Sequence, residues 1–449
     1  MDFQATQGQI RPLHGVNLGP LCYRGTIDLS VYQRELAIPL TRLHDVPWVN
    51  AEAVDIHTVF PDFRNDPAQA ESYQFALTDD YILAITNVQS RIVYRLGESI
   101  EHTARQYHVH PPSDPQKWAA ICLGIIRHYN RAWANGFRHD IRYWEIWNEP
   151  DVRPSMWTGT DQDYFRLYEV TAKAIKAEFP DVKVGGPALG GTGQFVGDAF
   201  RPSAFMTNFL SFCQQHQAPL DVFSWHCYTS QPWELPRRAN SVRHVLDQFG
   251  FAQADSHLNE WNYLPNDDWR PLVRQGQGAP RERWFGEMGG PTGAAFDAAV
   301  LLLLQDAPVD AANFYTGEIQ GFGLFNFQGV PKTSFYAFKA FRELLRTPER
   351  VQAVGNQAGQ LAVLAGVDAN RSRAGVLVSN FKATDEPLEV ILQNRPWEGA
   401  TQYEVLVVDA THNLAQVAQG VLQLSDRSLP LNLKAPAVAL IKLARAGSL

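Results

Sequence analysis

The chain has 449 residues, of which 45% are hydrophobic and 19% charged, a balance that excludes a disordered protein and allows a large buried core. This length exceeds one ordinary domain and fits an α/β barrel of about 250 residues with a smaller domain attached. A formal net charge of −8, without a run rich in Lys or Arg, argues against binding to nucleic acid or to an anionic membrane.

The amino terminus, MDFQATQGQIRP, has neither the basic nor the apolar region of a secretory signal, and no run of about 18 apolar residues follows it. We therefore expect a soluble cytoplasmic protein, or a periplasmic or secreted one if a targeting segment has been removed. The four cysteines lie far apart in apolar segments, which is typical of buried free thiols rather than of a zinc site or a disulfide scaffold.

Short apolar runs alternate with helical patterns from residue 14 to residue 345, which predicts repeated βα units around a parallel sheet, as in a (β/α)8 TIM barrel. The eight predicted strands are 15–18, 40–44, 91–96, 143–148, 182–187, 222–226, 257–260 and 312–315. The helix after the third strand should begin at Pro115, with Asp114 as its N-cap, and end at Gly136. Further helices are expected within 161–179 and 293–307.

Beyond residue 350 the pattern changes to alternating stretches divided by turns, such as QLAVLAGV, QYEVLVVDA and AVALIKLA, which predicts an accessory antiparallel β-sandwich. Residues 1–13 are too few for a domain and are expected to add an edge strand to it. We thus predict a barrel domain over 14–345 and an accessory domain made of 1–13 and 346–449.

Acids at the carboxyl ends of the predicted strands are the first candidates for chemistry, because TIM-barrel active sites lie at that end. Glu149, in RYWEIWNEPD, closes the fourth strand, and Glu260 closes the seventh. These strands lie roughly across the barrel mouth from each other, so both carboxylates can face one ligand. Two carboxylates about 5 to 5.5 Å apart support retaining glycoside hydrolysis.

Three segments, WNEP at 147–150, SWHCYTS at 224–230 and HLNEWN at 257–262, resemble the motifs of glycoside hydrolase family 39. This family is β-xylosidase-like and belongs to the clan A retaining (β/α)8 glycosidases. The resemblance continues through 164–191 and 321–341, and the trailing β-domain agrees with the family's architecture.

Carried over residue by residue, the resemblance implies that Glu149 is the general acid/base and Glu260 the nucleophile. The two acids need opposed environments, because Glu149 must hold a proton near neutrality and Glu260 must stay charged. Asn148 would hydrogen-bond the sugar 2-hydroxyl. His226 and Tyr228 would lie beside the acids, with Tyr228 orienting the nucleophile, although a buried core histidine is the alternative for His226.

Two residues of TRLHD receive roles from the same resemblance: Arg42 would keep the nucleophile ionised, and His44 would reach a sugar hydroxyl. The floor of the sugar site is predicted at Tyr315, where the family usually has a tryptophan. Glu318 is predicted either as an acid that binds sugar hydroxyls or as a residue without such a role.

Two further acids lie close to the WNEP motif in the sequence. Glu145 lies deeper on the same strand and is predicted to join a buried ion pair or hydrogen-bond network inside the barrel. Asp151 is predicted as a solvated or capping acid in the following loop.

Two loops complete the predicted surroundings of the site. The segment 264–291, with Trp269 and Trp284, is expected to overhang the rim and narrow it to a pocket, and its tryptophans either line that pocket or only anchor the loop. The stretch 101–112 has three histidines without HExxH spacing, which favours a polar loop over a metal site.

The resemblance implies a retaining exo-β-glycosidase without cofactor or metal, and we expect a β-xylosidase that releases terminal xylose from xylooligosaccharides during xylan degradation. The same mechanism on an α-L-arabinopyranoside, β-galactoside or β-glucoside, or an endo-acting polysaccharide hydrolase, is the nearest alternative. A non-catalytic carbohydrate-binding barrel is the alternative from another class. A monomer is expected rather than a tetramer, since the chain lacks the terminal extensions of tetrameric family members.

Overall fold

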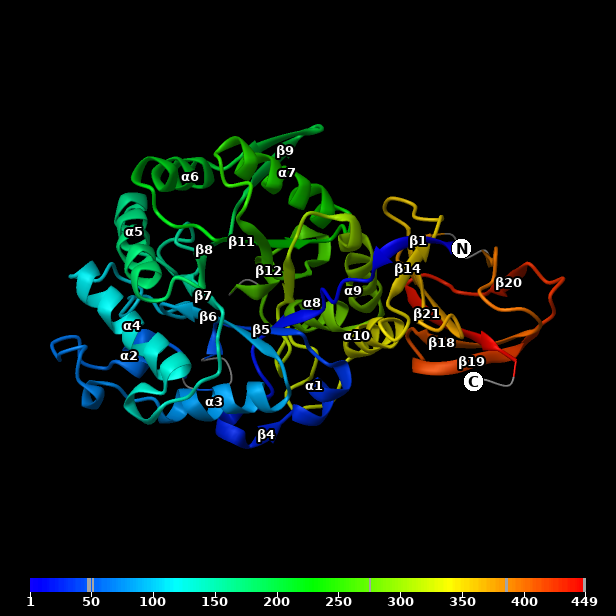
Figure 1. The fold of residues 1–449 in the computed structure, drawn as a ribbon, viewed down its shortest axis with the longest axis horizontal. Coiled ribbons are helices and arrows are strands. Elements are labelled where there is room, and N and C mark those ends of the chain that lie inside the picture. Colours follow the sequence, from blue (N-terminus) through cyan, green and yellow to red (C-terminus); the bar gives the residue numbers. More distant parts are fainter. Residues whose placement is uncertain (47–49, 51, 274–275, 384–386, 447–449) are drawn as a thin grey trace.

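A parallel barrel forms the larger part of the chain in a computed structural model that describes all residues except 47–49, 51, 274–275, 384–386 and 447–449 (Figure 1). The closed barrel confirms the predicted fold class, and each of its strands overlaps a predicted one. In barrel order the strands are β2 (Gly15–Asn17), β5 (Leu40–Leu43), β6 (Arg91–Leu96), β7 (Tyr143–Ile146), β8 (Lys183–Leu189), β11 (Val222–Thr229), β12 (Asp255–Tyr263) and β13 (Ala311–Phe314).

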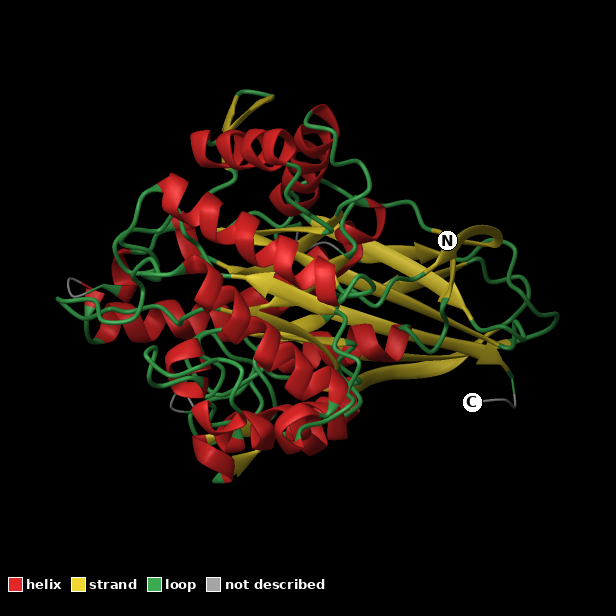
Figure 2. Cartoon of the chain, turned by 60° about the vertical axis from the view of Figure 1, so that its left-hand side comes forward, coloured by secondary structure: helices red, strands yellow, loops and turns green. Residues whose placement is uncertain are grey.

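Helices surround the barrel strands (Figure 2). They are α1 (Ser30–Leu36), α2 (Ile56–Val59), α3 (Ala76–Asn87), α4 (Pro115–Arg131), α5 (Asp161–Glu178), α6 (Ala204–His216), α7 (Glu234–Gln248), α8 (Ala279–Gly289), α9 (Pro291–Leu303) and α10 (Thr333–Leu344). Helix α4 begins as predicted, because the Asp114 carboxylate accepts hydrogen bonds from the backbone N–H groups of Gln116 and Lys117. It ends before the predicted Gly136, because Ala132 takes a left-handed conformation with φ 57° that breaks the helix.

A seven-stranded antiparallel sheet follows the barrel, and β1 at its edge confirms the expected contribution of the amino terminus. In sheet order its strands are β1 (Asp2–Gln9), β14 (Glu349–Gln352), β15 (Leu361–Val367), β16 (Arg373–Asn380), β21 (Ala437–Arg445), β18 (Thr401–Val408) and β19 (Asn413–Leu422). Smaller two-stranded units are β17 (Leu388–Ile391) with β20 (Ser428–Leu431), the hairpin β9 (Gly193–Val196) with β10 (Ala199–Pro202), and β3 (Leu21–Cys22) with β4 (Ile27–Asp28).

The antiparallel sheet has two apolar faces with different coverings. One face packs on α9 and α10, where the Ser379 hydroxyl donates to the Ala295 carbonyl and Lys442 pairs with Glu343 at 2.9 Å. The opposite face shares a separate core with the β17–β20 pair. Helix α9 is therefore apolar nearly all round because it lies between the barrel and this sheet. The domain limits 14–345 and 346–449 stay a prediction.

The four cysteines are free and buried, as expected. Within the described part of the chain, none of the helices combines the length and the apolar character that crossing a membrane requires.

Candidate active site

A pocket of about 410 Å³ contains both predicted catalytic acids. Its lining comes from the carboxyl-terminal parts of barrel strands and from the loops after them: His44, Asp45, Ile100, His102, Glu149, Val152, Gly190, Tyr228, Glu260, Trp269, Leu272, Tyr315 and Phe322. A larger groove of about 790 Å³ lies between α8 and the 320–333 segment, but none of these acids lines it. The smaller pocket is therefore the candidate active site, at the barrel end where such sites occur.

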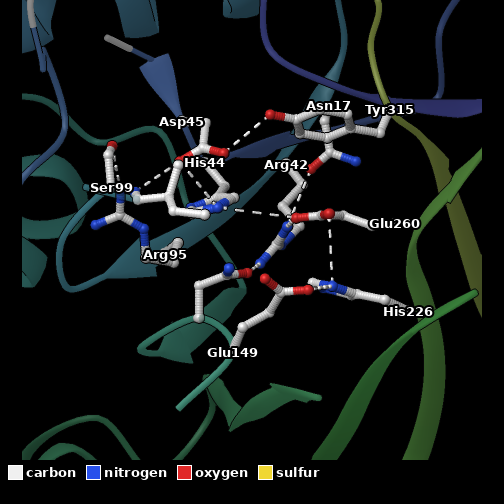
Figure 3. Close-up of polar contacts among 12 residues, drawn as sticks. Asn17, Arg42, His44, Asp45, Arg95, Ser99, Glu149, His226, Glu260 and Tyr315 are labelled. Atoms are coloured by element: carbon white, nitrogen blue, oxygen red, sulfur yellow. Dashed lines mark hydrogen bonds and ion pairs between the residues drawn. The ribbon is translucent and has the colours of Figure 1, made fainter. Parts of the chain in front are cut away.

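The two acids approach each other from the ends of β7 and β12 (Figure 3). One carboxylate oxygen of Glu149, one of Glu260 and one ring nitrogen of His226 all lie within 4.8 Å of one another. Glu149 has a left-handed backbone with φ 45°, and its N–H donates to the Ala188 carbonyl at 3.0 Å, which anchors the turn after β7 to β8. The carboxylates are thus close enough for one sugar ring to contact both.

Glu149 lies in an environment that favours its neutral form. Burial, together with the charge of Asp151, raises the pKa of Glu149 to about 8. Its Oε1 lies 2.7 Å from Nδ1 of His226, and burial lowers the pKa of His226 to about 4. At neutral pH the site therefore holds a protonated Glu149 beside a neutral imidazole.

Glu260 lies in the opposite kind of environment. Arg42 Nη1 donates to its Oε1 at 2.8 Å, and the Tyr228 hydroxyl donates to its Oε2 at 2.7 Å. His44 Nε2 lies 3.9 Å from Glu260 Oε1. Burial raises the pKa of Tyr228 well above its usual value, so its hydroxyl remains a donor at neutral pH. A charged donor and a neutral one thus both favour the ionised carboxylate.

Arg42 connects Glu260 to a buried network inside the barrel. Its side chain is fully buried, its Nε donates to Glu145 Oε2 at 2.7 Å, and its Nη2 donates to Asn148 Oδ1 at 2.5 Å. Glu145 also accepts from Asn259 Nδ2 at 2.5 Å, so the predicted buried structural acid is confirmed. Arg42 is fully buried and does not line the pocket, and its hydrogen bonds hold both Glu260 and Asn148 in position.

Asn148 retains one unused donor. Its side chain is buried, and its Nδ2 has no hydrogen-bond partner among the described residues, although its Oδ1 is held by Arg42. A buried amide without a partner is costly unless a ligand completes it. Its position beside Glu149 is the one expected for the sugar 2-hydroxyl donor.

Asp45 belongs to the pocket lining but was not predicted. It accepts from the Tyr315 hydroxyl at 2.9 Å and from the Ile100 N–H at 3.0 Å, and lies 3.1 Å from His44 Nε2 (Figure 3). Burial alone would raise the pKa of Asp45, but His44 and these hydrogen bonds hold it well below its usual value. The sequence signal that could have indicated this place in the pocket was its position immediately after His44, at the end of β5. Together with Tyr315, it forms a charged part of the pocket wall.

Glu318 does not reach the pocket. It is fully buried and accepts from the Tyr81 hydroxyl at 2.8 Å, and that hydroxyl in turn accepts from the Gly19 N–H at 2.6 Å. The segment after β13 folds inward at this point, so the interpretation of Glu318 as a sugar ligand is not supported. Burial raises the pKa of Glu318 well above its usual value, as for a neutral core acid.

The loops around the rim divide their roles. Trp269 is 41% exposed and lines the pocket, where its ring lies 5.1 Å from that of Tyr228, while Trp284 is buried and packs against Phe322. One tryptophan therefore lines the pocket and the other anchors the loop, of which residues 274–275 lie outside the described part. Asp151 caps the turn after β8, accepting from the N–H groups of Gly190 and Gly191 at 3.1 and 2.9 Å.

A second group of side chains that could hold a metal ion, Asp55, His57 and Glu98, lies outside this pocket. His57 Nδ1 is 2.6 Å from Glu98, and Arg95 donates to Asp55 at 2.5 Å. Although burial opposes it, the hydrogen bond that the His57 ring donates to the Glu98 carboxylate raises the pKa of His57 to about 9. Asp55 is thus paired with Arg95, and Glu98 is paired with His57, so all three side chains are already engaged in ion pairs.

Comparisons with known proteins identify a family for most of the chain. The family model for glycosyl hydrolases family 39 matches residues 22–375. A β-xylosidase of Geobacillus stearothermophilus is 28% identical over 262 residues, 53% of this chain and 48% of that protein. A β-xylosidase of Caldicellulosiruptor saccharolyticus is 25% identical over 264 residues, with the same coverage of 53% and 48%. The match thus spans about half the length of these relatives.

Solved structures share the whole architecture. A glucosidase from Croceicoccus marinus has a TM-score of 0.81 at 23% identity, covering 98% of both chains. A monomeric β-xylosidase from Caulobacter crescentus CB15 has a TM-score of 0.74 at 18% identity, covering 100% of this chain and 99% of that one. These likenesses establish the common fold, and the family model covers most of the sequence. The chain belongs to glycosyl hydrolases family 39.

Proposed function

We propose that this protein is a retaining exo-β-glycosidase that releases terminal xylose from a β-xyloside. The observation that carries the proposal is the pair of close carboxylates in opposed environments: burial raises the pKa of Glu149 to about 8, and Glu260 is bonded to Arg42 and Tyr228. The environment of Glu149 thus favours its protonated form, while the donors around Glu260 favour an attacking carboxylate, as the two steps of retaining hydrolysis need.

In the first step the Glu260 carboxylate attacks the anomeric carbon as the bond from that carbon to the leaving oxygen breaks. Glu149 gives its proton to this oxygen, so the leaving group departs as a neutral alcohol and a glycosyl ester remains on Glu260. In the second step the Glu149 carboxylate removes a proton from water while the water oxygen attacks the same carbon. The ester bond breaks, Glu260 regains its charge, and the product keeps its β-configuration.

Hydrogen-bonding groups for the sugar surround this pair. Asn148 is buried next to Glu149, and its Nδ2, which has no partner among the described residues, is the proposed donor for the 2-hydroxyl. The charged Asp45 and His44 line the pocket and offer acceptor and donor positions for more distant hydroxyls. Xylose is proposed because the two relatives above bear the name β-xylosidase. A β-glucoside is the second candidate, favoured by the glucosidase structure that matches 98% of the chain.

Hydrolysis of aryl glycosides by the purified protein tests the proposal. We expect turnover of the β-xyloside to exceed that of the β-glucoside, β-galactoside and α-L-arabinopyranoside, and proton NMR to detect the β-anomer of the sugar first. Faster turnover of the β-glucoside would favour the second candidate. An α-anomer formed first from a β-glycoside would exclude retention. No turnover of any aryl glycoside would leave a carbohydrate-binding barrel or an endo-acting enzyme.

Two variants test whether Glu149 is the proton donor and distinguish this role from the structural role of Glu145. Glu149→Ala should slow poor leaving groups far more than good ones, because only poor ones need the proton. Glu145→Gln is the variant with which this difference between poor and good leaving groups is compared, because Glu145 is buried in the Arg42 network outside the pocket. Equal losses on both leaving groups in Glu149→Ala would contradict its acid role.

We further propose that the enzyme acts as a monomer without a metal. The oxygen ligands of Glu260 are already engaged by Arg42 and Tyr228. Activity unchanged by EDTA and a monomer mass by light scattering are the expected results. Activity lost in EDTA and restored by a divalent cation would contradict the first, and a tetramer mass the second.

A further inference from the structure

The loop after β6 helps to place the Asp45 carboxylate in the pocket. This loop contributes Ile100 and His102 to the pocket lining, and the Ile100 N–H donates to Asp45 Oδ1 at 3.0 Å. Asp45 lies in the turn after β5 with φ 52°, a left-handed conformation that residues other than glycine adopt uncommonly. The orientation of Asp45 therefore depends on where the loop after β6 holds the Ile100 N–H.

Asp55 lies outside the pocket and holds the residue that precedes Ile100. Its Oδ2 accepts the Ser99 N–H at 2.9 Å, and its Oδ1 accepts from the Ser99 hydroxyl at 2.9 Å and from Arg95 Nη2 at 2.5 Å. Asp55 is 1% exposed and Arg95 is fully buried, so water does not compete for these bonds. Ser99 and Arg95 lie on the Asp45 side of the site (Figure 3). One buried carboxylate thus fixes the backbone immediately before Ile100.

Glu98 adds a second contact between the same two loops, with the carboxylate on the other loop. It accepts the His57 N–H at 3.2 Å, and its other oxygen lies 2.6 Å from His57 Nδ1. Three consecutive residues of the loop after β6, 98–100, thus bond to His57, Asp55 and Asp45 of the loop after β5. The last of these contacts lies in the pocket, and the Asp55 contact is the one immediately before it.

We infer that Asp55 is a positioning residue for sugar binding: by fixing residues 98–100, it keeps the Ile100 N–H where it holds the Asp45 carboxylate. This role rests on the proposed function, in which Asp45 is an acceptor for a sugar hydroxyl. Asp55 does not line the pocket, so it acts on the sugar only through the residues that it holds. A misplacement of about 1 Å can cost about 100-fold in rate without the loss of any group that touches the substrate.

Asp55→Asn disturbs the Ser99 backbone with little change in side-chain volume. Arg95 Nη2 and the Ser99 N–H are obligatory donors that reach different Asp55 oxygens, so the asparagine NH2 faces a donor in either orientation. We expect kcat/KM on the best aryl glycoside to fall by about fivefold to 100-fold. A fall below about threefold in the folded variant would overturn the inference.

A double-mutant cycle with Asp45→Ala distinguishes positioning from general stability. Asp45→Ala removes the carboxylate that Asp55 positions, so Asp55→Asn should then cost less than about twofold. A residue that only stabilises the fold would instead lower kcat/KM by the same factor in both backgrounds. Factors that differ by less than about twofold between the two backgrounds would therefore overturn the inference. Single-turnover measurements with excess enzyme extend the comparison to slow variants.

Ser99→Ala tests the same contact with a smaller change. It removes the hydroxyl bond to Asp55 and keeps the backbone, and it takes the place of Asp55→Asn in the cycle if that variant does not fold. We expect a loss of about twofold or more that disappears in the Asp45→Ala background. Unchanged kcat/KM in Ser99→Ala would then overturn the inference.

Asp79→Asn is the control variant. The Asp79 carboxylate lies on α3, 2.9 Å from both His128 Nε2 and the Tyr129 hydroxyl, and it does not line the pocket. We expect its kcat/KM to stay within about twofold in both backgrounds. A loss in Asp79→Asn equal to that in Asp55→Asn would contradict the role of Asp55. Absence of turnover by the unchanged protein on every aryl glycoside would instead refute the proposed function itself, so the two failures are distinguishable.

Discussion

Replacing Tyr228 with phenylalanine removes a single hydrogen bond from the proposed nucleophile. The hydroxyl donates to Glu260 Oε2 at 2.7 Å, while the ring packs on Trp269 and Tyr315, contacts that phenylalanine keeps. A hydrogen bond to a charged group contributes about 1.5 to 3 kcal/mol, and about 1.4 kcal/mol corresponds to a factor of ten in rate. If the bond is needed to orient the attacking carboxylate, Tyr228→Phe should lower activity by about 10- to 150-fold.

The assay is kcat/KM on the best aryl glycoside, because this constant reports the steps up to formation of the glycosyl-enzyme. Tyr263→Phe is the matched control, since the Tyr263 hydroxyl donates to the Glu287 carboxylate, also at 2.7 Å, but does not line the pocket. We expect the control to retain activity within about twofold. A loss below about threefold in Tyr228→Phe, or an equal loss in both variants, would refute the reasoning.

Charge and burial give three more expected outcomes. The kcat/KM for substrates with poor leaving groups should fall above about pH 8, because Glu149 loses its proton there. Asp151→Asn removes a negative charge that raises the pKa of Glu149, so it should move this fall to lower pH. A fall that stays at the same pH, or moves to higher pH, would contradict the expectation. Arg42→Met leaves Glu145 without its buried cation and should reduce the free energy of unfolding, measured by urea denaturation, by about 3 to 5 kcal/mol. A loss below about 1 kcal/mol would contradict the structural role of the Arg42 network. Burial raises the pKa of Asp297 well above its usual value, so folding takes up a proton, and the free energy of unfolding falls by about 1.4 kcal/mol per pH unit once the acid is ionised in the unfolded chain. Asp297→Asn should therefore stabilise the protein at pH 7 but not near pH 4. Equal effects of the substitution at both pH values would contradict this account of Asp297.

The barrel and its two acids were predictable because their signals are local. Each barrel strand is a short apolar run closed by polar residues, and Glu149 and Glu260 stand where such runs end. Glu145 was also predictable, since its parity on β7 directs it into the barrel and a buried carboxylate there needs a partner.

What the sequence did not reveal depends on contacts between distant segments or on backbone geometry without a residue signature. Asp45 acquires its role from Tyr315, which lies 270 positions away, and Glu318 is turned inward to a hydroxyl on α3. The early end of α4 arises from an alanine in a left-handed conformation, a state that favours glycine and that no pattern predicts for alanine.

The central claim is that Glu260 forms the covalent bond to the sugar while Glu149 carries the proton. Incubation with a 2-deoxy-2-fluoro glycoside, followed by proteolysis and mass mapping, tests it most directly, because the fluorine slows breakdown of the intermediate. We predict a single label on the peptide that contains HLNEWN, located at Glu260 and absent in Glu260→Gln. A label on any other residue, or inactivation without a covalent adduct, would contradict the account.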